Sequence, residues 1–353
     1  MHYPKTKDLQ KILDRVEACL EEGLPFALYR KPNEDEISGV FQADAALHHS
    51  KDFTEKGFVF APFDSEDKVV LIQPDEIWKG KFHYEASQDT NSISLDESGR
   101  EAHINLVKSG IKEIEKGRLQ KVVLSRKIEV TVSKSPIKIL KTLLNKYPNA
   151  FGYLFHHPKV GIWCGATPET LVKVRDKKLQ TMSLAATLPY LENEKPKWAK
   201  KEIEEQQMVS EYIGDKLAHT MERLEIDEAE SVRAGNLWHL RSEVRGSMMP
   251  NLKVKEVIRA LHPTPAVCGI PTGEATQFIR ANENYKRTFY TGFLGELNLN
   301  AQGELSLFVN LRCMQLENGK ASIFVGGGIT EASNPESEWE ETQNKSKTML
   351  GIL

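Results

Sequence analysis

Most strand-like segments of this chain follow one another through short turns rather than through helices. Residues 150–155 and 160–164 have the pattern of two strands joined in a hairpin, and the last third alternates short strand-like runs with turns before it closes on a helix. Short connections favour antiparallel pairing, because parallel strands need a long crossover. We therefore expect an α+β fold, with mainly antiparallel sheets packed with helices, rather than a doubly wound parallel sheet.

The spacing of apolar residues predicts helices between these strands. No long Pro/Gly/Ser-rich linker interrupts the chain, so one large domain is expected rather than two. The helices are expected at residues 7–22, 98–116, 136–146, 198–224 and from 335 onward, and further strands at 25–29, 57–61 and 121–132.

Charge and cysteine usage exclude several classes of protein. The 353 residues include 47 Lys+Arg and 50 Asp+Glu, a net charge of −3, which is unsuited to nucleic-acid binding through a basic surface. The four cysteines form no CxxC pair, as expected for buried thiols in a reducing compartment. Residues 1–5 lack the apolar start of a secretory signal, and no apolar run is long enough to span a membrane. A cytoplasmic protein without membrane contact is expected.

Two helical segments carry acidic residues whose spacing predicts a shared site. Glu205 continues an apolar ridge with Val209, so its carboxylate should face the core, where it must be paired, protonated or metal-bound. In the last helix, Glu338, Glu341 and Lys345 fall on one face. Acids from separate helices can hold one Mg²⁺ ion, which typically takes one or two carboxylates together with waters and an anionic substrate group.

Both acidic segments also have a structural explanation. Acids in the first turn of a helix interact favourably with its dipole. Glu205 can form a salt bridge with a lysine or reach solvent with its carboxylate. The residues alone therefore leave a metal site and a structural role open.

Three consecutive glycines offer backbone N–H groups to an anion. Residues 323–329 form a strand-like run that enters Gly326, Gly327 and Gly328. Bare backbone can approach a carboxylate or phosphate closely, although such a run is often only a turn. The Gly-Lys-Ser/Thr sequence of a phosphate-binding loop does not follow, so nucleotide binding is not indicated.

Four other residues could carry chemistry. Arg312 lies in the apolar segment 307–313, and a guanidinium in mid-strand needs an anionic partner such as a carboxylate. His262 precedes a proline in a restricted segment, where a single histidine is more often structural than catalytic. Lys121 begins a strand-like stretch and Glu169 follows a turn, and neither is informative alone.

Taken together and in order, these segments resemble the chorismate-utilising enzyme family, which contains isochorismate synthases, salicylate synthases and the synthase subunits for anthranilate and aminodeoxychorismate. The resemblance implies the fold of anthranilate synthase component I. It also implies a single chorismate-binding domain, 1–353, with a more variable part, 1–95, and a motif-bearing catalytic part, 96–353. The matching segments are residues 121–126, 165–171, 183–187, 201–209, 261–266, 292–296, 311–313 and 326–345.

The resemblance implies a role for each matching residue. Lys121 matches the general base that activates water, Glu169 the general acid and His262 the active-site histidine. Glu205 and Glu341 match the two glutamates that bind the Mg²⁺ cofactor, with Glu338 nearby. The positions that match substrate-binding ones are Tyr290, Arg312, Lys345, Gly326, Gly327, Gly328, Ala186 and Thr187.

Three residues depart from the family's pattern. Gln206 stands where the family has a histidine after the first metal-binding acid, and Gly327 replaces the alanine of a Gly-Ala-Gly loop. Ala186 replaces a glycine before Thr187, and its methyl group is expected to narrow the pocket and lower activity.

Lys121 distinguishes among the subfamilies, because relatives that use ammonia lack this lysine and need no base to deprotonate water. Its presence and the chain length favour an isochorismate synthase, in which water attacks C2 of chorismate and the C4 hydroxyl leaves. A salicylate synthase, which also eliminates pyruvate, and a chorismate-binding relative with impaired turnover remain alternatives. We expect no glutaminase subunit and a monomer or weak dimer. The menaquinone and siderophore pathways both stay open.

Overall fold

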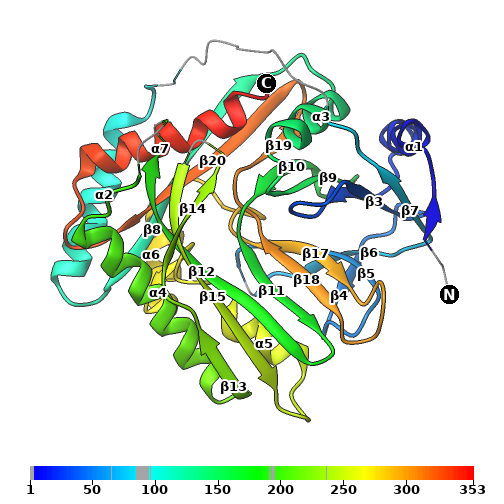
Figure 1. The fold of residues 1–353 in the computed structure, drawn as a ribbon. Helices are drawn as coiled ribbons and strands as arrows, with labels where there is room; N and C mark the ends of the chain where they lie inside the picture. Colours follow the sequence, from blue (N-terminus) through cyan, green and yellow to red (C-terminus); the bar gives the residue numbers. More distant parts are fainter. Residues whose placement is uncertain are drawn as a thin grey trace.

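Two large β-sheets stack partly face to face, and helices cover their outer faces (Figure 1). The computed structural model describes residues 4–64, 66–84, 95, 97–190, 192, 195–235 and 237–353. Among these residues the only parallel pair is β1–β7, and all other strand pairs are antiparallel. The predicted α+β fold with mainly antiparallel sheets is therefore confirmed.

The first sheet has ten strands, and the second has nine in a row plus β14, which pairs with β15. In spatial order, the first sheet contains β1 (Lys5–Thr6), β7 (Glu76–Lys81), β3 (Glu36–Phe41), β2 (Phe26–Arg30), β9 (Phe151–His157), β10 (Gly161–Thr167), β19 (Cys313–Glu317), β20 (Lys320–Ile329), β8 (Lys121–Thr131) and β16 (Gly269–Ile270). The second contains β13 (Met221–Ile226), β15 (Leu237–Met248), β12 (Lys178–Pro189), β11 (Thr170–Arg175), β18 (Leu305–Val309), β17 (Phe293–Leu297), β5 (Gly57–Ala61), β6 (Val69–Ile72) and β4 (His48–Ser50), with β14 (Glu230–Ala234) beside β15.

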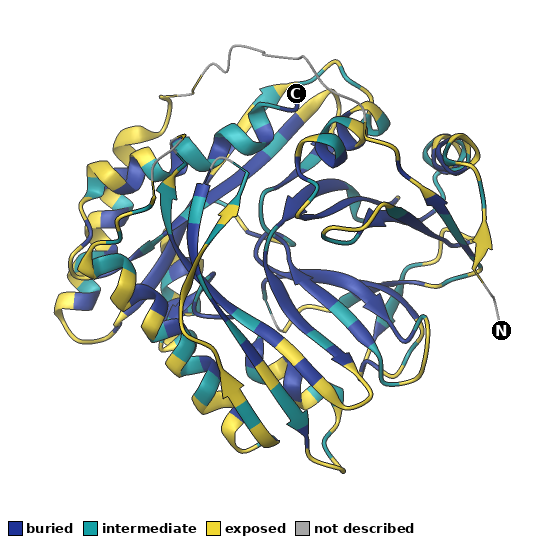
Figure 2. Ribbon diagram, in the orientation of Figure 1, coloured by how far each residue is buried: buried dark blue, intermediate teal, exposed yellow. Residues whose placement is uncertain are grey.

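Aromatic side chains fill the space between the two sheets. Tyr29 of the first sheet packs on Phe58 of the second, and Phe151 stacks on Phe308 with ring centroids 4.1 Å apart. The strands are accordingly buried over most of their length, while the outer surfaces of the helices are exposed (Figure 2). Burial of large rings supplies most of the driving force that holds the sheets together.

Apolar helix faces form separate cores on the outside of the sheets. Helices α1 (Leu9–Glu22) and α3 (Pro136–Lys146) pack on the first sheet, and α4 (Lys200–Ala218) and α5 (Val254–Leu261) pack on the second. Helices α2 (Arg100–Glu115) and α6 (Thr272–Asn282) cover β8, and α2 lies beside α7 (Pro335–Leu350) (Figure 1). Of the two helices with the predicted metal ligands, α4 packs on β12 and β15 of the second sheet, and α7 packs on β20 of the first.

Two expectations about helices in the second half of the chain are wrong. The helix expected at 198–224 ends at Ala218, and residues 221–226 instead pair with β15 as β13. The apolar spacing continues past Ala218 without a glycine or proline to stop the helix, so only the pairing with β15 reveals the end. Helices α5 and α6 lie where the sequence suggested strands and turns.

The N-terminal part is built into both sheets, since β2 and β3 belong to the first and β4, β5 and β6 to the second. The boundary expected at 95/96 adjoins residues 85–94 and 96, which lie outside the described residues, and the single-domain expectation stays a prediction. All four cysteines are buried and unpaired. No described helix combines the length and apolarity needed to cross a membrane.

Candidate active site

A cavity lies where β20 passes between helices α4 and α7. Its lining brings together many of the predicted residues from distant parts of the chain: Glu169, Ala186, Thr187, Glu205, Tyr290, Arg312, Gly326, Gly327, Gly328, Glu341 and Lys345. Lys121 and Glu338 lie directly behind this lining, next to Gly328 and Gly327. The residues that were predicted from separate segments therefore form one polar site.

The three glycines lie within strand β20 rather than in the expected loop. A Cβ atom on Gly328 would be 2.2 Å from Glu205 Oε1, and one on Gly327 would be 3.1 Å from Glu338 Oε2. Real Cβ atoms do not approach oxygens at the first of these distances. The glycines are thus required because the carboxylates of α4 and α7 point at the bare backbone of β20.

Each of three carboxylates at the site pairs with a lysine. Glu205 Oε1 lies 2.9 Å from Lys121 Nζ, so the salt bridge considered for Glu205 is present. In the other two pairs, Lys345 Nζ lies 2.5 Å from Glu341 Oε1 and Lys201 Nζ lies 2.5 Å from Glu338 Oε1. The sequence gave no indication that Lys201 takes part, because a lysine in the first turn of α4 is usually exposed.

The charges of the two acids on α7 differ. Burial, and the neighbouring Glu341, raise the pKa of Glu338 to about 7. Burial also acts against ionisation of Glu341, but its ion pair with Lys345 outweighs this effect and lowers its pKa. Glu341 is therefore the ionised member of the pair at neutral pH, and Glu338 is close to half-protonated.

The donor atoms around Gly327 and Gly328 suit a hard cation. Glu338 Oε2 is buried and has no hydrogen-bond partner among the described residues, and it faces the bare backbone of Gly327. In the described part of the chain no three carboxylate, imidazole or thiolate groups form a complete cage. Oxygen donors in this number fit Mg²⁺, which usually keeps several waters or substrate oxygens.

Glu169 is buried in a way that favours its protonated form. It lies between β10 and β11 with a side chain that is 3% exposed. Burial raises its pKa to about 8, although the nearby cations Lys121 and Arg312 act in the opposite direction. A carboxyl group with this pKa carries a proton at pH 7 and can donate it.

Arg312 is not in the middle of a strand as expected, but in the turn between β18 and β19, with φ of +45°. Its carbonyl accepts a hydrogen bond from Ala166 N, and its guanidinium points into the cavity beside His239, with 3.4 Å between Nη2 and Nε2. No carboxylate neutralises Arg312 among the described ion pairs. Its guanidinium is available to an anion in the cavity.

His239 is a cavity residue that the sequence reasoning missed. Its Nδ1 donates to the carbonyl of Ala186 at 2.8 Å, which leaves Nε2 as an acceptor facing Arg312. Burial and, to a smaller extent, the nearby Arg312 lower the pKa of His239 to about 3, so the ring is neutral. A lone histidine in the strand-like run 237–242 gave no signal of this role.

Two residues that depart from the family's pattern have clear local consequences. Ala186 adopts a φ of +60°, a left-handed conformation that favours glycine, at an irregularity of β12. Gln206 donates from Nε2 to Ser183, Ser210 and Ser242 and so ties α4 to β12 and β15. The amide thus helps to fix the start of the ridge that carries Glu205.

The structure does not bring His262 into this cavity. Its Nε2 lies 3.1 Å from the carbonyl of Pro62, and its ring packs edge-on against Phe293. Burial lowers its pKa to about 4. The residues that follow it do reach the cavity, because Ala266 and Val267 are part of the lining.

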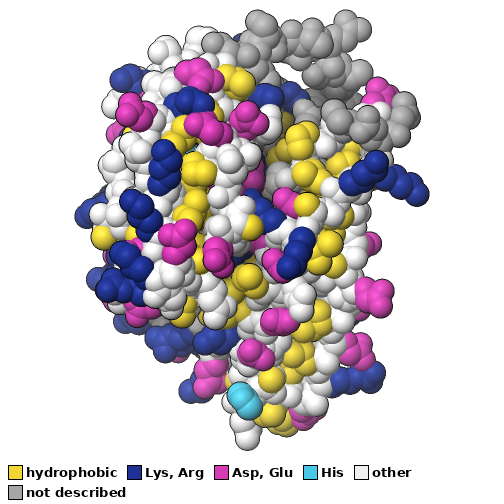
Figure 3. All heavy atoms as spheres, turned by 90° about the vertical axis from the view of Figure 1, so that its left-hand side faces the viewer, with side chains coloured by type: hydrophobic (Ala, Val, Ile, Leu, Met, Phe, Trp, Pro, Cys, Tyr) yellow, Lys and Arg dark blue, Asp and Glu magenta, His cyan; other side chains and the backbone are white. Residues whose placement is uncertain are grey.

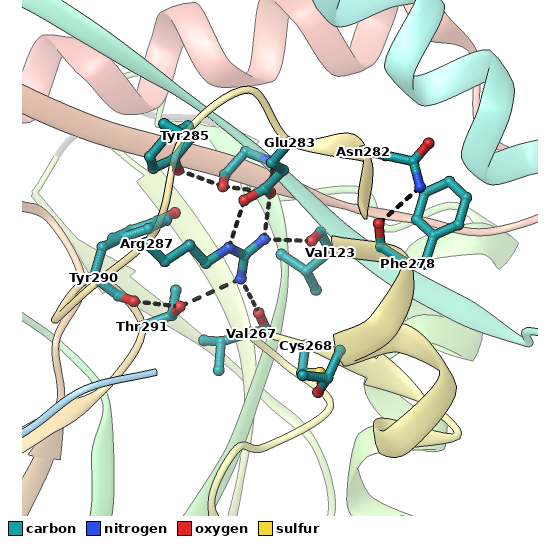
Figure 4. Close-up of polar contacts among 12 residues, drawn as sticks. Val123, Val267, Cys268, Phe278, Asn282, Glu283, Tyr285, Arg287, Tyr290 and Thr291 are labelled. Atoms are coloured by element: carbon teal, nitrogen blue, oxygen red, sulfur yellow. Dashed lines mark hydrogen bonds and ion pairs between the residues drawn. The ribbon is translucent and has the colours of Figure 1, made fainter. Parts of the chain in front are cut away.

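A buried ion pair, Arg287–Glu283, holds three segments of the cavity wall together (Figure 4). The Arg287 guanidinium donates to Glu283, to the carbonyls of Val123 and Val267, and to Thr291. Glu283 also accepts hydrogen bonds from the backbone and hydroxyl of Ser125 on β8. The strand that begins at Lys121 is therefore fixed to the segments that carry Val267 and Tyr290.

Outside the cavity, basic and acidic side chains are mixed. On the face drawn in Figure 3, Lys and Arg side chains are interspersed with Asp and Glu side chains. This agrees with the net charge of −3.

Comparison with known proteins finds relatives over nearly the whole chain. Isochorismate synthase DhbC of Bacillus subtilis is 30% identical over 323 residues, which cover 83% of this chain and 79% of DhbC. Isochorismate synthase EntC of Escherichia coli K12 is 27% identical over 345 residues, which cover 91% of this chain and 86% of EntC.

Solved structures share the fold as well. A protein described as a candidate 2,3-dihydroxybenzoate-specific isochorismate synthase, DhbC from Bacillus anthracis, superposes with a TM-score of 0.81 at 26% identity, and the match covers 95% of this chain and 98% of that chain. Anthranilate synthase component I from Streptococcus pneumoniae has the same fold, with a TM-score of 0.70 at 20% identity and 92% coverage of both chains. A family model described as chorismate binding enzyme matches residues 68–353, and the chain belongs to this family.

Proposed function

We propose that the protein is an isochorismate synthase, a Mg²⁺-dependent isomerase that converts chorismate to isochorismate. The observation that carries the proposal is that one site contains both a buried lysine, Lys121, and a buried acid, Glu169, whose pKa of about 8 keeps it protonated. The relatives named isochorismate synthases support the same reaction. The proposal includes the roles of the individual site residues and the absence of a glutaminase partner.

The reaction needs one proton removed and one delivered. Lys121 takes a proton from the water that attacks C2, and Glu169 gives its proton to the hydroxyl that leaves C4, so that a water is consumed and a water is released. Because Lys121 faces Glu205 at 2.9 Å, the proposal requires this ion pair to be open when water is activated. Two well-placed groups of this kind each contribute about 10²–10⁴ in rate.

The remaining residues orient a dianion. Arg312 holds one carboxylate through its two-pronged guanidinium, while Tyr290 and the N–H groups near Gly326 contact the other end of the substrate. Glu205 and Glu341 would hold Mg²⁺, with Glu338 close by, and the bound ion would neutralise and orient a substrate carboxylate. Lys345 fixes this arrangement, because its Nζ contacts both Glu341 and the carbonyl of Gly326.

The proposal is tested by incubating the purified protein with chorismate and Mg²⁺ and separating the products by chromatography. We expect isochorismate as the product. Its formation should be lost in Glu169→Gln and after chelation of the metal. Release of pyruvate and salicylate would instead identify a salicylate synthase. Product formation that requires ammonia would contradict the role of Lys121.

A chorismate-binding relative with impaired turnover is the second candidate, and the left-handed conformation of Ala186 favours it. Its methyl group lies in the cavity wall at a position whose backbone suits glycine. Such a protein would be stabilised against heat by chorismate and Mg²⁺ without forming product. Ala186→Gly would then restore turnover.

A further inference from the structure

A second, wider cavity adjoins the candidate active site. The two cavities share Pro168, Leu184 and Arg312 in their walls. The rest of its lining comes from Asn33, Ala166, residues 146–150 at the end of α3, residues 232–235 at the end of β14, Arg241 of β15 and Thr348 of α7. Because Arg312 belongs to both walls, a ligand in the second cavity meets the same guanidinium that faces the active site.

The charges in the second cavity have one sign. Its lining includes Lys146, Arg233, Arg241 and Arg312, and among the described residues no Asp or Glu lines it. Arg241 is neutralised by ion pairs with Glu230 and with another acid of β15. The net positive charge that faces this cavity therefore comes from the other three cations.

Arg233 is held in place without an acidic partner. Its Nε donates to the carbonyl of Gly235, and its guanidinium lies 3.6 Å from the centroid of the Tyr190 ring. Among the described residues it forms no ion pair, whereas Arg223 on the neighbouring strand β13 is paired with Glu225. A fixed, exposed and unneutralised arginine at the rim of a cavity is suited to attract anions.

A larger groove on the same sheet differs from the second cavity, because acidic as well as basic side chains line it. That groove contains cations such as Lys173 and Arg245, but Glu225, Glu296 and Glu304 line it as well. Mixed charges of this kind cancel over a short distance. Among the described residues, uniformly positive side chains are thus a feature of the second cavity, which leads to Arg312, and not of the larger groove.

We propose that the second cavity is an outer binding site that captures small dicarboxylate anions and passes them to Arg312. This inference rests on the proposed function only for the identity of the anion, chorismate. A positive cleft with low-dielectric walls concentrates field lines and raises the rate of association of an oppositely charged ligand. Arg233 is a steering residue here, and it takes no part in the chemical step.

The test measures the association rate of chorismate by stopped-flow tryptophan fluorescence, since Trp163 stacks on Phe324 in the wall of the active-site cavity. Arg233→Glu reverses one charge against a dianion. We expect association to slow on the order of tenfold at low ionic strength and roughly threefold near about 0.15 M salt. Turnover at saturating chorismate should not change. Arg233→Lys should retain most of the wild-type association rate.

Arg223→Glu is the matched control, because it reverses a charge on the neighbouring strand outside the second cavity. Equal slowing in both Glu variants, or an unchanged rate in Arg233→Glu, would overturn the outer site. If chorismate binds with these rates but yields no isochorismate, the proposed function fails and the outer site stands. If isochorismate forms while Arg233→Glu associates normally, only the outer site fails. If chorismate does not bind the wild type, both are rejected.

Discussion

Two buried ionic clusters lie near β8, and they differ in how completely their polar atoms are bonded. In the Arg287 cluster, formed with Glu283, Ser125 and Thr291, all three guanidinium nitrogens donate hydrogen bonds. In the glycine-strand cluster, formed by Lys121, Glu205, Glu338, Glu341 and Lys345 around β20, Glu338 Oε2 has no hydrogen-bond partner in the described part of the chain, and the printed contact of Lys121 Nζ is its ion pair with Glu205.

This difference separates a structural role from a functional one. Buried charges are tolerated when every donor and acceptor is bonded, and such a network makes its surroundings rigid. Buried polar atoms without partners are rare and mark places where a ligand, ion or water completes the bonding. We infer that the Arg287 cluster holds the cavity wall and that the glycine-strand cluster receives substrate and metal.

The largest effect is expected from Lys121→Met in the glycine-strand cluster. Turnover should fall by about 10²–10⁴, because the base is lost while the volume of its side chain is kept. Stability in the presence of Mg²⁺ should change by less than about 2 kcal/mol, because Glu205 can pair with the bound metal. Lys127→Met, on an exposed residue of the same strand, is the control for both the rate and the urea midpoint. Wild-type turnover in Lys121→Met would refute the assignment of the base.

Arg287→Met should have the opposite profile, with a large loss of stability. Removal of Arg287 leaves the buried carboxylate of Glu283 without its countercharge, and the expected cost is about 3–5 kcal/mol in the free energy of unfolding. Urea denaturation of this variant and of Lys121→Met measures the difference between the clusters directly. Similar losses in the two variants would contradict the distinction between them.

The two clusters also differ in how far the sequence predicted them. The four-residue spacing from Glu205 to Val209 correctly placed Glu205 on the buried face of a helix, and the last helix correctly presented Glu338, Glu341 and Lys345 together. Helix periodicity is local, so the sequence reveals it. The Arg287 cluster was missed, because its bonds to Val123 and Val267 depend on long-range packing of backbone carbonyls.

The same limit explains the errors within the site. From apolar runs, Arg312 was placed in mid-strand and the three glycines in a loop. Strand pairing decides where a strand ends, however, and β18 ends at Val309 while β20 continues through Gly328. His239 belongs to no matching segment, and Lys201 lies in the matching segment 201–209 without a role assigned to it there. Residue types were therefore predictable, and the contacts that set their protonation were not.

Turnover and stability should both depend on pH through Glu169, which lies beside the glycine-strand cluster. Its pKa is raised by burial to about 8, so turnover should fall about tenfold per pH unit above pH 8 as the acid loses its proton. Because its pKa is raised in the folded protein, Glu169 contributes stability that is fully present below its ordinary pKa of 4.5. This contribution is lost as the pH rises towards 8.

Glu169→Gln separates the two consequences. It should abolish most turnover and remove the fall in stability between pH 4.5 and 8. The measurement is a series of thermal unfolding curves across this range. A stability profile that stays identical to that of the wild type would show that Glu169 is ionised in the folded protein at neutral pH.

The smallest effect is expected from Ala186→Gly, which tests whether the cavity wall carries strain. The φ of +60° costs an alanine about 1–2 kcal/mol, which glycine would not incur. The greater freedom of glycine in the unfolded chain offsets about 0.5–1 kcal/mol of this stabilisation. We therefore expect a net stabilisation of about 0.5–1 kcal/mol. Ala185→Gly, at the adjacent position in β12, should instead destabilise by about the same amount, because its conformation suits alanine. If both variants lose stability equally, Ala186 is unstrained, and its methyl group no longer explains a loss of turnover.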